Sequence, residues 1–318
     1  MKITVVGAGG NVGATVALSI AQRDFAKQVV CIDLERKEGD KTFYPSKGRA
    51  LDQWQTSPVY GFDTHLVGGT DYEMTKDSDI CVITAGVPRR PGMSRDDLLG
   101  TNANIVDSVT RELVKHSPNT IIVVVSNPLD VMTYVAWKAS GLPAERVMGM
   151  AGILDTARYR AFLAEELKIS PKDIQALILG GHGDTMVPLP RYTTVSGIPV
   201  TQLIAKDKLD AIIERAKVGG GELVGLMGTS AWYAPGAASA QMVEAIALDQ
   251  NRIFPCAAWL TGQFGLKDLY VGVPVKLGAG GIKEIVEVEL NKEEQELLNN
   301  SAEHVRTAFK DLERIMNG

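Results

Sequence analysis

The stretch KITVVGAGGNVGATVALSIAQRDFAKQVVCID, residues 2–33, decides which fold the first half of the chain adopts. Residues 2–6 form an apolar run typical of a buried strand, and a glycine-rich loop follows it directly. Residues 14–23 have a helical pattern, and residues 28–33 form a second strand-like run. A strand, a glycine loop, a helix and a second strand make up the nucleotide-binding unit of doubly wound α/β folds.

The glycine loop runs from Gly7 to Gly13 and reads GAGGNVG. It departs from the GxGxxG pattern because Val12 occupies the place of the last glycine. Aligned as GxxGxxG instead, the loop uses Gly7, Gly10 and Gly13. In both alignments, small residues let backbone amides and a helix N-terminus approach a pyrophosphate. A structural tight turn is the alternative, but the strand before the loop and the helix after it favour cofactor binding.

Asp33 ends the second strand-like run, 20 residues after Gly13. A carboxylate at this position accepts hydrogen bonds from both ribose hydroxyls of the cofactor and repels a 2′-phosphate. The sequence therefore predicts NAD rather than NADP, although Arg36, Lys37 and Lys41 would act against that preference. The alternative is a surface aspartate beside a structural turn.

Strand-like and helical segments continue to alternate up to about residue 150. The apolar runs at residues 80–84 and 121–125 are rich in Val and Ile, which suits parallel strands buried on both faces. Helical patterns at residues 98–114 and 131–140 separate these runs. The sequence therefore predicts an α/β fold, with a Rossmann-type doubly wound parallel sheet over residues 1–150.

The pattern changes in residues 151–318, which we expect to form an α+β substrate-binding and catalytic domain. Its expected helices cover residues 155–167, 206–227, 237–247 and 292–315. Its expected antiparallel strands cover residues 192–195, 198–201, 257–260, 270–275 and 282–289.

Composition argues against several classes of function. The chain has 318 residues and a net charge of −5, so it carries no basic footprint for nucleic acid. The uncharged stretch at residues 223–243 contains Pro235, three glycines and several polar residues, which does not suit a membrane span. Cys31, Cys81 and Cys256 form no CxxC pair and no zinc pattern. We therefore expect buried thiols, no metal site and a cytoplasmic chain without a leader.

Two short segments carry the candidate catalytic residues: residues 153–158 read ILDTAR, and residues 180–184 read GGHGD. His182 is a side chain that can pass a proton near neutral pH, and a carboxylate such as Asp155 can orient and charge it. Arg158 projects from nearly the same helix face as Asp155. The three residues together predict proton transfer on a substrate that carries a carboxylate. Taken singly, each has a structural interpretation: a solvated helix pair or a structural histidine.

Residues 85–95 read AGVPRRPGMSR and follow a buried strand. Loops at this end of such strands line the ligand crevice, and an arginine-rich loop is typical of a lid that carries positive charge. A solvated basic loop is the alternative. Residues 126–130 read SNPLD and end another core strand at the same edge.

In these motifs, and nearly from end to end, the chain resembles the lactate/malate dehydrogenases. It looks most like the malate dehydrogenases of the lactate-dehydrogenase-like type. The most specific segments are residues 85–95, 126–130, 152–158 and 180–188. The resemblance implies reversible oxidation of (S)-malate to oxaloacetate with NAD. It also implies a homo-oligomer, with a tetramer built from dimers favoured over a stable dimer.

The resemblance implies a role for each candidate residue. His182 would donate and accept the proton, and Asp155 would hold it. Arg158 would bind the C1 carboxylate, Arg95 would polarise the reacting carbonyl, and Arg89 would select a substrate with a second carboxylate. Lactate enzymes typically carry glutamine in place of Arg89. The expected cofactor contacts are Gly7, Gly9, Gly10, Asn11, Val12, Gly13, Asp33, Asn102, Val125 and Asn127, of which Asn127 would also touch the substrate.

Two features depart from the family pattern. The glycine loop has one residue more than is usual in the branch that the chain resembles most. The segment at residues 35–47 is longer than the usual turn and contains Phe43, Tyr44 and Pro45 beside the expected adenosine pocket. We expect a harmless excursion here. The alternative is an effect on cofactor or subunit contacts.

Three other functions remain open from the sequence. A lactate or other 2-hydroxyacid dehydrogenase would be favoured by a neutral residue at position 89. A non-catalytic NAD-binding or redox-sensing protein would be expected to lack His182, Asp155 or the arginines. A structural oligomer could keep the fold alone. Oxidation of NADH with oxaloacetate separates these functions.

Overall fold

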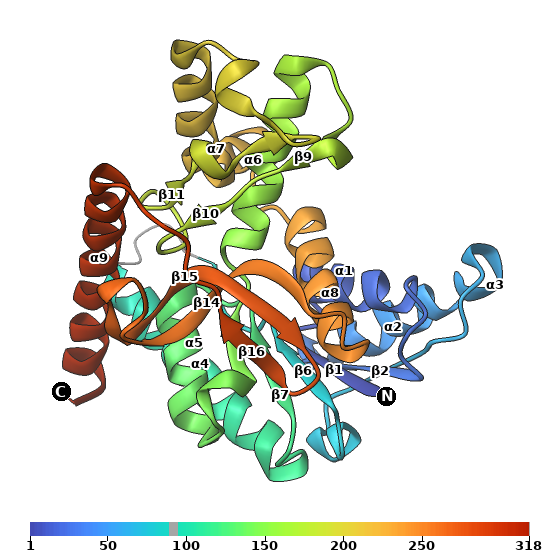
Figure 1. Ribbon diagram of the computed structural model, residues 1–318. Coiled ribbons are helices and arrows are strands. Elements are labelled where there is room, and N and C mark those ends of the chain that lie inside the picture. The colour runs from blue at the N-terminus through green and yellow to red at the C-terminus, as the bar shows by residue number, and fades with distance from the viewer. Residues whose placement is uncertain (89–94, 318) are drawn as a thin grey trace.

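The computed structural model describes residues 1–88 and 95–317, and its centre is one mixed sheet of nine strands (Figure 1). The strand order is β16-β15-β14-β8-β7-β6-β1-β2-β5. Six strands are parallel: β1 (Lys2–Val6), β2 (Gln28–Ile32), β5 (His65–Gly69), β6 (Ile80–Ile83), β7 (Ile121–Val124) and β8 (Val147–Gly149). Three strands are antiparallel: β14 (Arg252–Thr261), β15 (Lys267–Gly278) and β16 (Gly281–Ile285).

The parallel strands are buried because their apolar runs contact helices on both faces. Val5 lies between Cys31 of β2 and Val82 of β6, and all three are in the core. The chain leaves β1 toward β2 on one side and reaches β6 on the other. This reversal of strand order at β1 is the place where doubly wound sheets bind ligands, outside the carboxyl ends of the strands.

Nine α-helices are found in the described part of the chain. They are α1 (Asn11–Ala21), α2 (Pro45–Trp54), α3 (Ser57–Tyr60), α4 (Arg95–His116), α5 (Leu129–Ser140), α6 (Gly152–Leu167), α7 (Lys206–Met227), α8 (Tyr233–Ala247) and α9 (Lys292–Asn317). The short 3₁₀ helices are η1 (Tyr72–Thr75), η2 (Ala144–Arg146), η3 (Pro171–Asp173), η4 (Pro190–Tyr192), η5 (Val200–Gln202) and η6 (Gln263–Gly265). The small strands are β3 (Arg36–Glu38), β4 (Lys41–Phe43), β9 (Ile174–Gln175), β10 (Ile178–Leu179), β11 (Val187–Pro188), β12 (Thr194–Val195) and β13 (Ile198–Pro199).

The predicted Rossmann-type fold class, with an α+β half after it, is confirmed. The sheet nevertheless continues past residue 150, because β14 joins β8 through the pair Ala257 and Gly149. The antiparallel strands of the second half therefore extend the sheet of the first half. The domain boundary expected near residue 150 stays a prediction.

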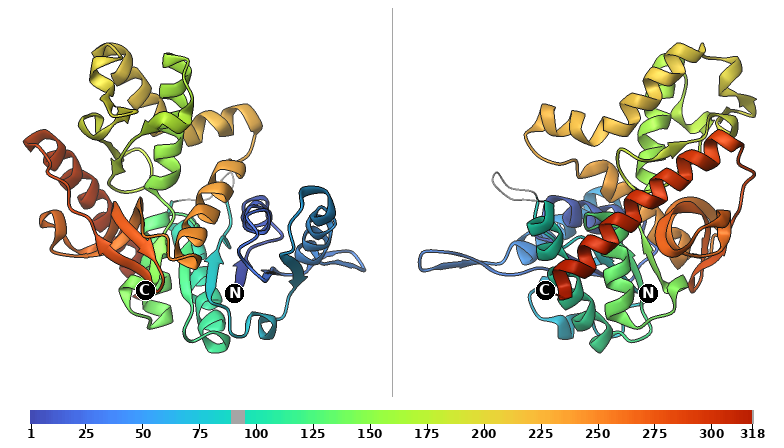
Figure 2. Two further views of the ribbon diagram at one scale, coloured as in Figure 1. Left: turned by 45° about the vertical axis from the view of Figure 1, so that its right-hand side comes forward. Right: turned by 90° about the vertical axis from the view of Figure 1, so that its left-hand side faces the viewer.

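A smaller lobe stands on the edge of the sheet where the parallel strands end (Figures 1 and 2). It contains the outer half of α6, α7 and the small sheet of β9, β12 and β13. The lobe has its own apolar core, which includes Tyr159, Leu163, Ile174 and Leu209. α6 starts in the main body and ends in the lobe, so it connects the two cores.

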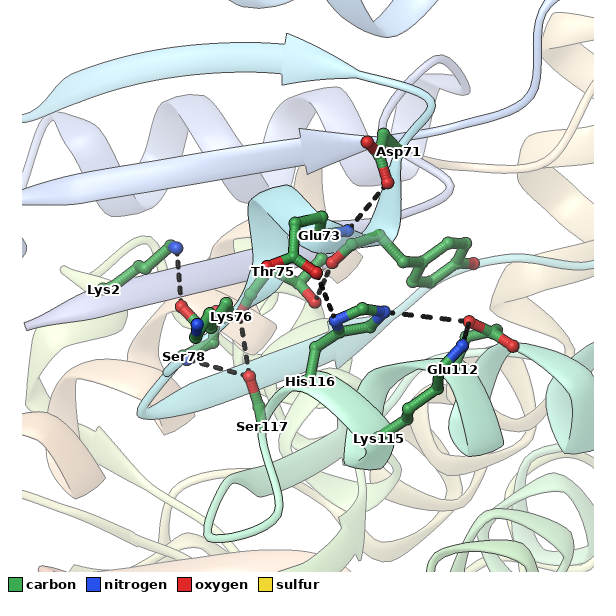
Figure 3. A network of polar contacts seen from close by, with 11 residues as sticks. Lys2, Asp71, Glu73, Thr75, Lys76, Ser78, Glu112, Lys115, His116 and Ser117 are labelled. Carbon is green, nitrogen blue, oxygen red and sulfur yellow. Dashed lines mark hydrogen bonds and ion pairs between the residues drawn. The ribbon is translucent and has the colours of Figure 1, made fainter.

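The C-terminal end of α4 is fixed by a polar network near the amino ends of β1 and β6 (Figure 3). His116 Nδ1 lies 3.1 Å from a carboxylate oxygen of Glu73. The hydroxyl of Ser117 donates to the carbonyl of Thr75 and accepts the backbone N–H of Ser78. The network holds a helix whose other end starts at Arg95, beside the candidate site.

Among the described helices, none has both the length and the apolar character that a membrane span requires.

Candidate active site

A cavity of about 640 Å³ lies at the carboxyl ends of β1, β6 and β7. The glycine loop and residues 84–88 and 125–127 line one side of it. His182, Arg158, Gly220 and Gly221 of α7 and residues 229–232 line it too. Segments that are far apart in the sequence therefore meet around one space, at the edge of the sheet that the strand order predicts.

The glycine loop brings the start of α1 close to β1. Gly7 has a φ of 86°, and a Cβ atom on Gly13 would lie 2.4 Å from the carbonyl oxygen of Gly7. α1 begins after Gly10 without a side-chain cap, so its first N–H groups point out of the helix. Gly7, Gly10, Asn11, Val12 and Gly13 all line the cavity. Backbone donors at a helix N-terminus fit the pyrophosphate of a dinucleotide.

Gly9 and Asp33 face a second cavity on the other side of the loop. One carboxylate oxygen of Asp33 accepts the backbone N–H of Gly9 at 2.7 Å, and the other accepts that of Leu34 at 2.8 Å. The predicted ribose acceptor therefore lies against the glycine loop. Its predicted role stays a prediction.

His182 and Asp155 form a direct pair. His182 Nδ1 lies 2.8 Å from Asp155 Oδ2, and the Asp155 side chain is 1% exposed. Burial alone would lower the pKa of His182, but the Asp155 charge and hydrogen bond outweigh it, so the pKa is raised above its ordinary value. His182 lines the cavity. With Nδ1 engaged, Nε2 is the nitrogen that can exchange a proton with a bound substrate.

Arg158 lies on the next turn of α6 and contacts the other oxygen of Asp155 at 3.3 Å. Its Nε is buried and has no hydrogen-bond partner within residues 1–88 and 95–317. α7 leaves room beside the guanidinium, because a Cβ atom on Gly220 would lie 3.8 Å from Nη1. A partly buried guanidinium with an unused buried donor at a cavity wall fits an anionic ligand such as a carboxylate.

The loop that carries His182 is held by four elements. Gly180 exchanges backbone hydrogen bonds with Gly272 of β15, and the N–H of Gly181 donates to Ser301 Oγ of α9 at 2.9 Å. The N–H of His182 donates to Asp130 Oδ2 of α5 at 3.0 Å. The side chain of His182 binds α6 through Asp155.

Asp130 and Ser301 are residues that the sequence did not single out. Asp130 is buried, and burial raises its pKa to about 6. Its second oxygen has no hydrogen-bond partner in the described part of the chain. The SNPLD motif contains Asp130, and an acidic residue in the first turn of a buried helix was the available signal. Ser301 gave no such signal, because its partner Gly181 lies 120 residues away.

The amide of Asn102 is used within the protein. Its oxygen accepts the N–H of Val87 at 2.8 Å, and its nitrogen donates to the carbonyls of Val87 and Asn127. Asn102 thus ties α4 to the segments after β6 and β7. Asn102, Val125 and Asn127 also line the cavity, and their cofactor contacts stay predictions.

Two predicted substrate residues are not placed. Arg89 lies outside the described residues. Arg95 is the first residue of α4, and its side chain lies outside the described part of the chain. Among the described residues, no group of three or more His, Cys, Asp or Glu side chains could hold a metal ion.

The chain matches two family models that together cover most of its length. Residues 1–149 match the NAD-binding domain of lactate/malate dehydrogenase, and residues 153–315 match its α/β C-terminal domain. The chain is 59% identical to the malate dehydrogenase of Salinibacter ruber over 315 residues, which are 99% of this chain and 98% of that protein.

Solved structures agree with these matches. The malate dehydrogenase structure from Salinibacter ruber has a TM-score of 0.94 at 57% identity, and the match covers 100% of this chain and 99% of that one. The malate dehydrogenase structure from Plasmodium falciparum in complex with NADH has a TM-score of 0.89 at 35% identity, with 99% of each chain covered.

Proposed function

The chain belongs to the lactate/malate dehydrogenase family, and we propose that it interconverts (S)-malate and oxaloacetate with NAD as the hydride carrier. One observation carries the proposal: His182, paired with Asp155, and the partly buried Arg158 line the same cavity as the glycine loop. A proton acceptor, a cation for a carboxylate and a cradle for a dinucleotide are the groups that oxidation of a 2-hydroxyacid requires.

In this mechanism His182 moves the proton. During oxidation, Nε2 takes the hydroxyl proton of malate, and Asp155 stabilises the charge that forms on the ring. In the opposite direction, protonated His182 returns the proton to the carbonyl oxygen of oxaloacetate. NAD, when bound, accepts the hydride from C2 of malate, and NADH supplies it in reduction.

The arginines divide the anionic groups of the substrate between them. We propose that Arg158 binds the C1 carboxylate in a two-pronged pair, for which its planar guanidinium is suited. Arg95 polarises the reacting carbonyl, and Arg89 binds the second carboxylate. The charge that develops on the carbonyl oxygen then meets His182 and Arg95. Closure of the segment expected at residues 85–95, of which 89–94 lie outside the described residues, would exclude water from the reaction.

The test is a substrate panel of oxaloacetate and pyruvate, each with NADH and NADPH. We expect oxaloacetate with NADH to give the highest kcat/KM, because Asp33 would repel a 2′-phosphate and Arg89 would be left without a partner by pyruvate. Higher efficiency with pyruvate would favour the alternative, a lactate or other 2-hydroxyacid dehydrogenase. No oxidation of NADH with any substrate would favour a non-catalytic NAD-binding protein.

Arg89→Gln sharpens the same test. Removing one partner of a desolvated charge pair costs roughly 2–5 kcal/mol, which is about 30- to several-thousand-fold in kcat/KM for oxaloacetate. Efficiency with pyruvate is expected to rise. The matched control is Arg90→Gln, next in the sequence and equal in charge. If only the Arg90 change alters the oxaloacetate-to-pyruvate ratio, the wrong arginine has been chosen, and if neither does, selectivity lies elsewhere.

For its assembly, we propose a homotetramer built from dimers, with a stable dimer as the alternative. Large apolar side chains on α2 and α3 support an oligomer, since Leu51, Trp54, Val59 and Tyr60 are exposed in the single chain. We further propose that the enzyme acts in the cytoplasm, in the tricarboxylic acid cycle. Light scattering after gel filtration measures the mass and separates tetramer, dimer and monomer.

A further inference from the structure

The segment that is longer than expected forms a β-hairpin beside Asp33. β3 and β4 pair in antiparallel register from Arg36 opposite Phe43 to Glu38 opposite Lys41. All six strand residues are exposed, and Figure 2 shows the hairpin projecting from the body of the molecule. An isolated two-stranded hairpin is marginally stable in water, so a partner that packs against it would add to its stability.

The hairpin carries aromatic and basic side chains near its base. The Arg36 guanidinium lies 5.5 Å from the centre of the Phe43 ring, and Lys47 Nζ lies 4.6 Å from the centre of the Tyr44 ring. Phe43 and Tyr44 remain 40% and 41% exposed. Large aromatic rings that stay this exposed have apolar surface available for a ligand.

Arg36, Phe43 and Tyr44 line the second cavity. The cavity has a volume of about 740 Å³. Gly9, Gly10 and Asp33 line it together with residues 34–36, 43–45, 48 and 49. Gly10 lines both cavities, so the two spaces meet at the glycine loop.

The long segment and the long glycine loop touch each other. A Cβ atom on Gly9 would lie 2.8 Å from Asp33 Oδ2 and 3.0 Å from Pro45 Cβ. The N–H of Gly9 also donates to Asp33. Gly9, Asp33 and Pro45 therefore lie close together. The two departures from the family pattern, the longer glycine loop and the longer segment at residues 35–47, meet at this point beside the expected cofactor site.

The order of the chemical groups along NAD predicts which of them enters the second cavity. The glycine loop fits the pyrophosphate, and Asp33 fits the adjacent ribose. The nicotinamide end has to lie toward His182, in the first cavity, for hydride transfer. The group that follows the ribose in the other direction is an adenine ring, and flat aromatic rings bind such a base by stacking.

We propose that the hairpin of residues 35–44 is an added wall of the cofactor site, and that Tyr44 binds the adenine ring of NAD by stacking. The inference deepens the proposed function and rests on it. Tyr44 is the residue of choice because it precedes Pro45, which contacts Gly9, and because it makes no side-chain cap for α2. Phe43 completes the wall.

The experiment is calorimetric titration of the full-length protein with ADP-ribose, which has the adenosine diphosphate part of NAD without nicotinamide. Tyr44→Ala is expected to weaken ADP-ribose and NADH binding by about 5- to 10-fold, the lower part of the range for loss of base stacking, since Tyr44 is partly exposed. Tyr44→Phe keeps the ring and should keep the affinity. Ile198→Ala on β13, an exposed residue outside both cavities, is the control.

A second measurement needs no variant. Hydrogen exchange of residues 35–44 in the wild-type protein is expected to slow when ADP-ribose is added. Unchanged affinity in Tyr44→Ala, or unchanged exchange in the wild type, overturns the inference. A change in oligomeric mass with unchanged affinity assigns the hairpin to subunit contacts and also overturns it. If the wild type fails to oxidise NADH with any substrate, the proposed function fails, which is a separate result.

Discussion

At one end of the cofactor site four elements hold the loop of His182, whereas at the other end one exposed hairpin forms the outer wall beside Asp33. The His182 loop has its N–H groups bonded to Ser301 and Asp130, and its imidazole to Asp155. The hairpin has six exposed strand residues and is held by its own ladder and ring contacts.

The difference follows from what each end has to do. Proton transfer requires that donor and acceptor lie within hydrogen-bond reach, and a catalytic group has to be held within about 0.5 Å of that geometry. A stacked base tolerates small displacements, because the contact is spread over a ring face. The comparison predicts that changes at the His182 end act on kcat, and that changes at the hairpin act on cofactor affinity.

His182→Ala is the strongest test of the comparison. Loss of a general acid–base group is expected to lower kcat by roughly 10²–10⁴-fold, while NADH still binds. The matched control is His304→Ala on α9, where the exposed ring hydrogen-bonds to the backbone carbonyl of Asn300 through Nδ1. Stopped-flow turnover and NADH titration measure the two effects. Turnover near that of the wild type in a folded His182→Ala protein would remove His182 from the mechanism.

Asp155→Asn tests how the pair sets the pH dependence. Burial lowers the pKa of His182, the Asp155 and Asp130 charges raise it, and Arg158 lowers it, with a raised pKa as the result. Reduction of oxaloacetate needs protonated His182, so its kcat/KM falls as the pH rises through that pKa. Asp155→Asn removes the largest raising effect, and the fall is expected at a lower pH. The loss of rate should be smaller than for His182→Ala.

A pH profile recorded between pH 5 and 9 with NADH checks this direction. A fall that stays in place, or that moves to higher pH, would mean that Asp155 does not control the charge of His182. Histidine-selective NMR in the same variant gives the pKa without turnover.

The sequence predicted best those parts of the fold that depend on local pattern. β1 and α7 begin and end at the predicted residues, because apolar runs and helical periodicity are properties of neighbouring residues. β5 was not predicted, since it ends in two glycines. A Cβ atom on Gly68 would lie 2.3 Å from the carbonyl oxygen of Ser46 in α2, so close packing of helix on strand takes the place of an apolar side chain.

The residues of the candidate site also fall into two groups: those that a local motif marks and those that depend on long-range contacts. The sequence marked His182 and Asp155 because each lies in a distinctive short motif, and the resemblance gave them roles. Asp130 and Ser301 depend on contacts over 52 and 120 residues, and no local pattern encodes such pairs. The β3–β4 hairpin was expected only as an excursion of the chain, because a pair of charged, exposed strands has no apolar alternation.

Asp130→Ala tests whether the hydrogen bond from the His182 N–H to Asp130 affects kcat. It leaves the His182 N–H without its acceptor, at a cost of about 1–3 kcal/mol, or roughly 5- to 150-fold in kcat if the loop shifts. Asp130→Asn keeps an acceptor oxygen and should keep most of the rate. Burial raises the pKa of Asp130 to about 6, so its carboxylate is charged above that pH.

The pH profile separates positioning from simple loss of stability. The Asp130 charge helps to raise the pKa of His182. Asp130→Asn should therefore match the wild type below pH 6, where Asp130 is neutral, and lose activity earlier as the pH rises. Equal profiles over the whole range would show that Asp130 acts on the fold alone.

Ser301→Ala is the mildest test. It removes the hydrogen bond that Ser301 donates to Thr185 Oγ1 and the one that it accepts from the Gly181 N–H. The second of these holds the backbone of the His182 loop and is worth about 0.5–1.5 kcal/mol, so kcat should fall by no more than roughly 10-fold. ADP-ribose affinity should not change, because the hairpin lies at the other end of the site. Thr307→Ala on the same helix is the control, since the exposed Thr307 hydroxyl donates to the backbone carbonyl of Glu303 in its own helix. Its kcat should equal that of the wild type.

Double variants complete the test, since residues that act on one loop do not contribute independently. Ser301→Ala and Asp130→Ala both release backbone donors of the His182 loop, so their effects on kcat should be coupled by more than about 0.5 kcal/mol. Ser301→Ala and Tyr44→Ala lie at opposite ends of the site and should be additive within roughly 0.5 kcal/mol. Coupling in the second pair would mean that the site responds as one unit and that its two ends are not built separately. Additivity in the first pair would mean that Ser301 and Asp130 hold the His182 loop independently.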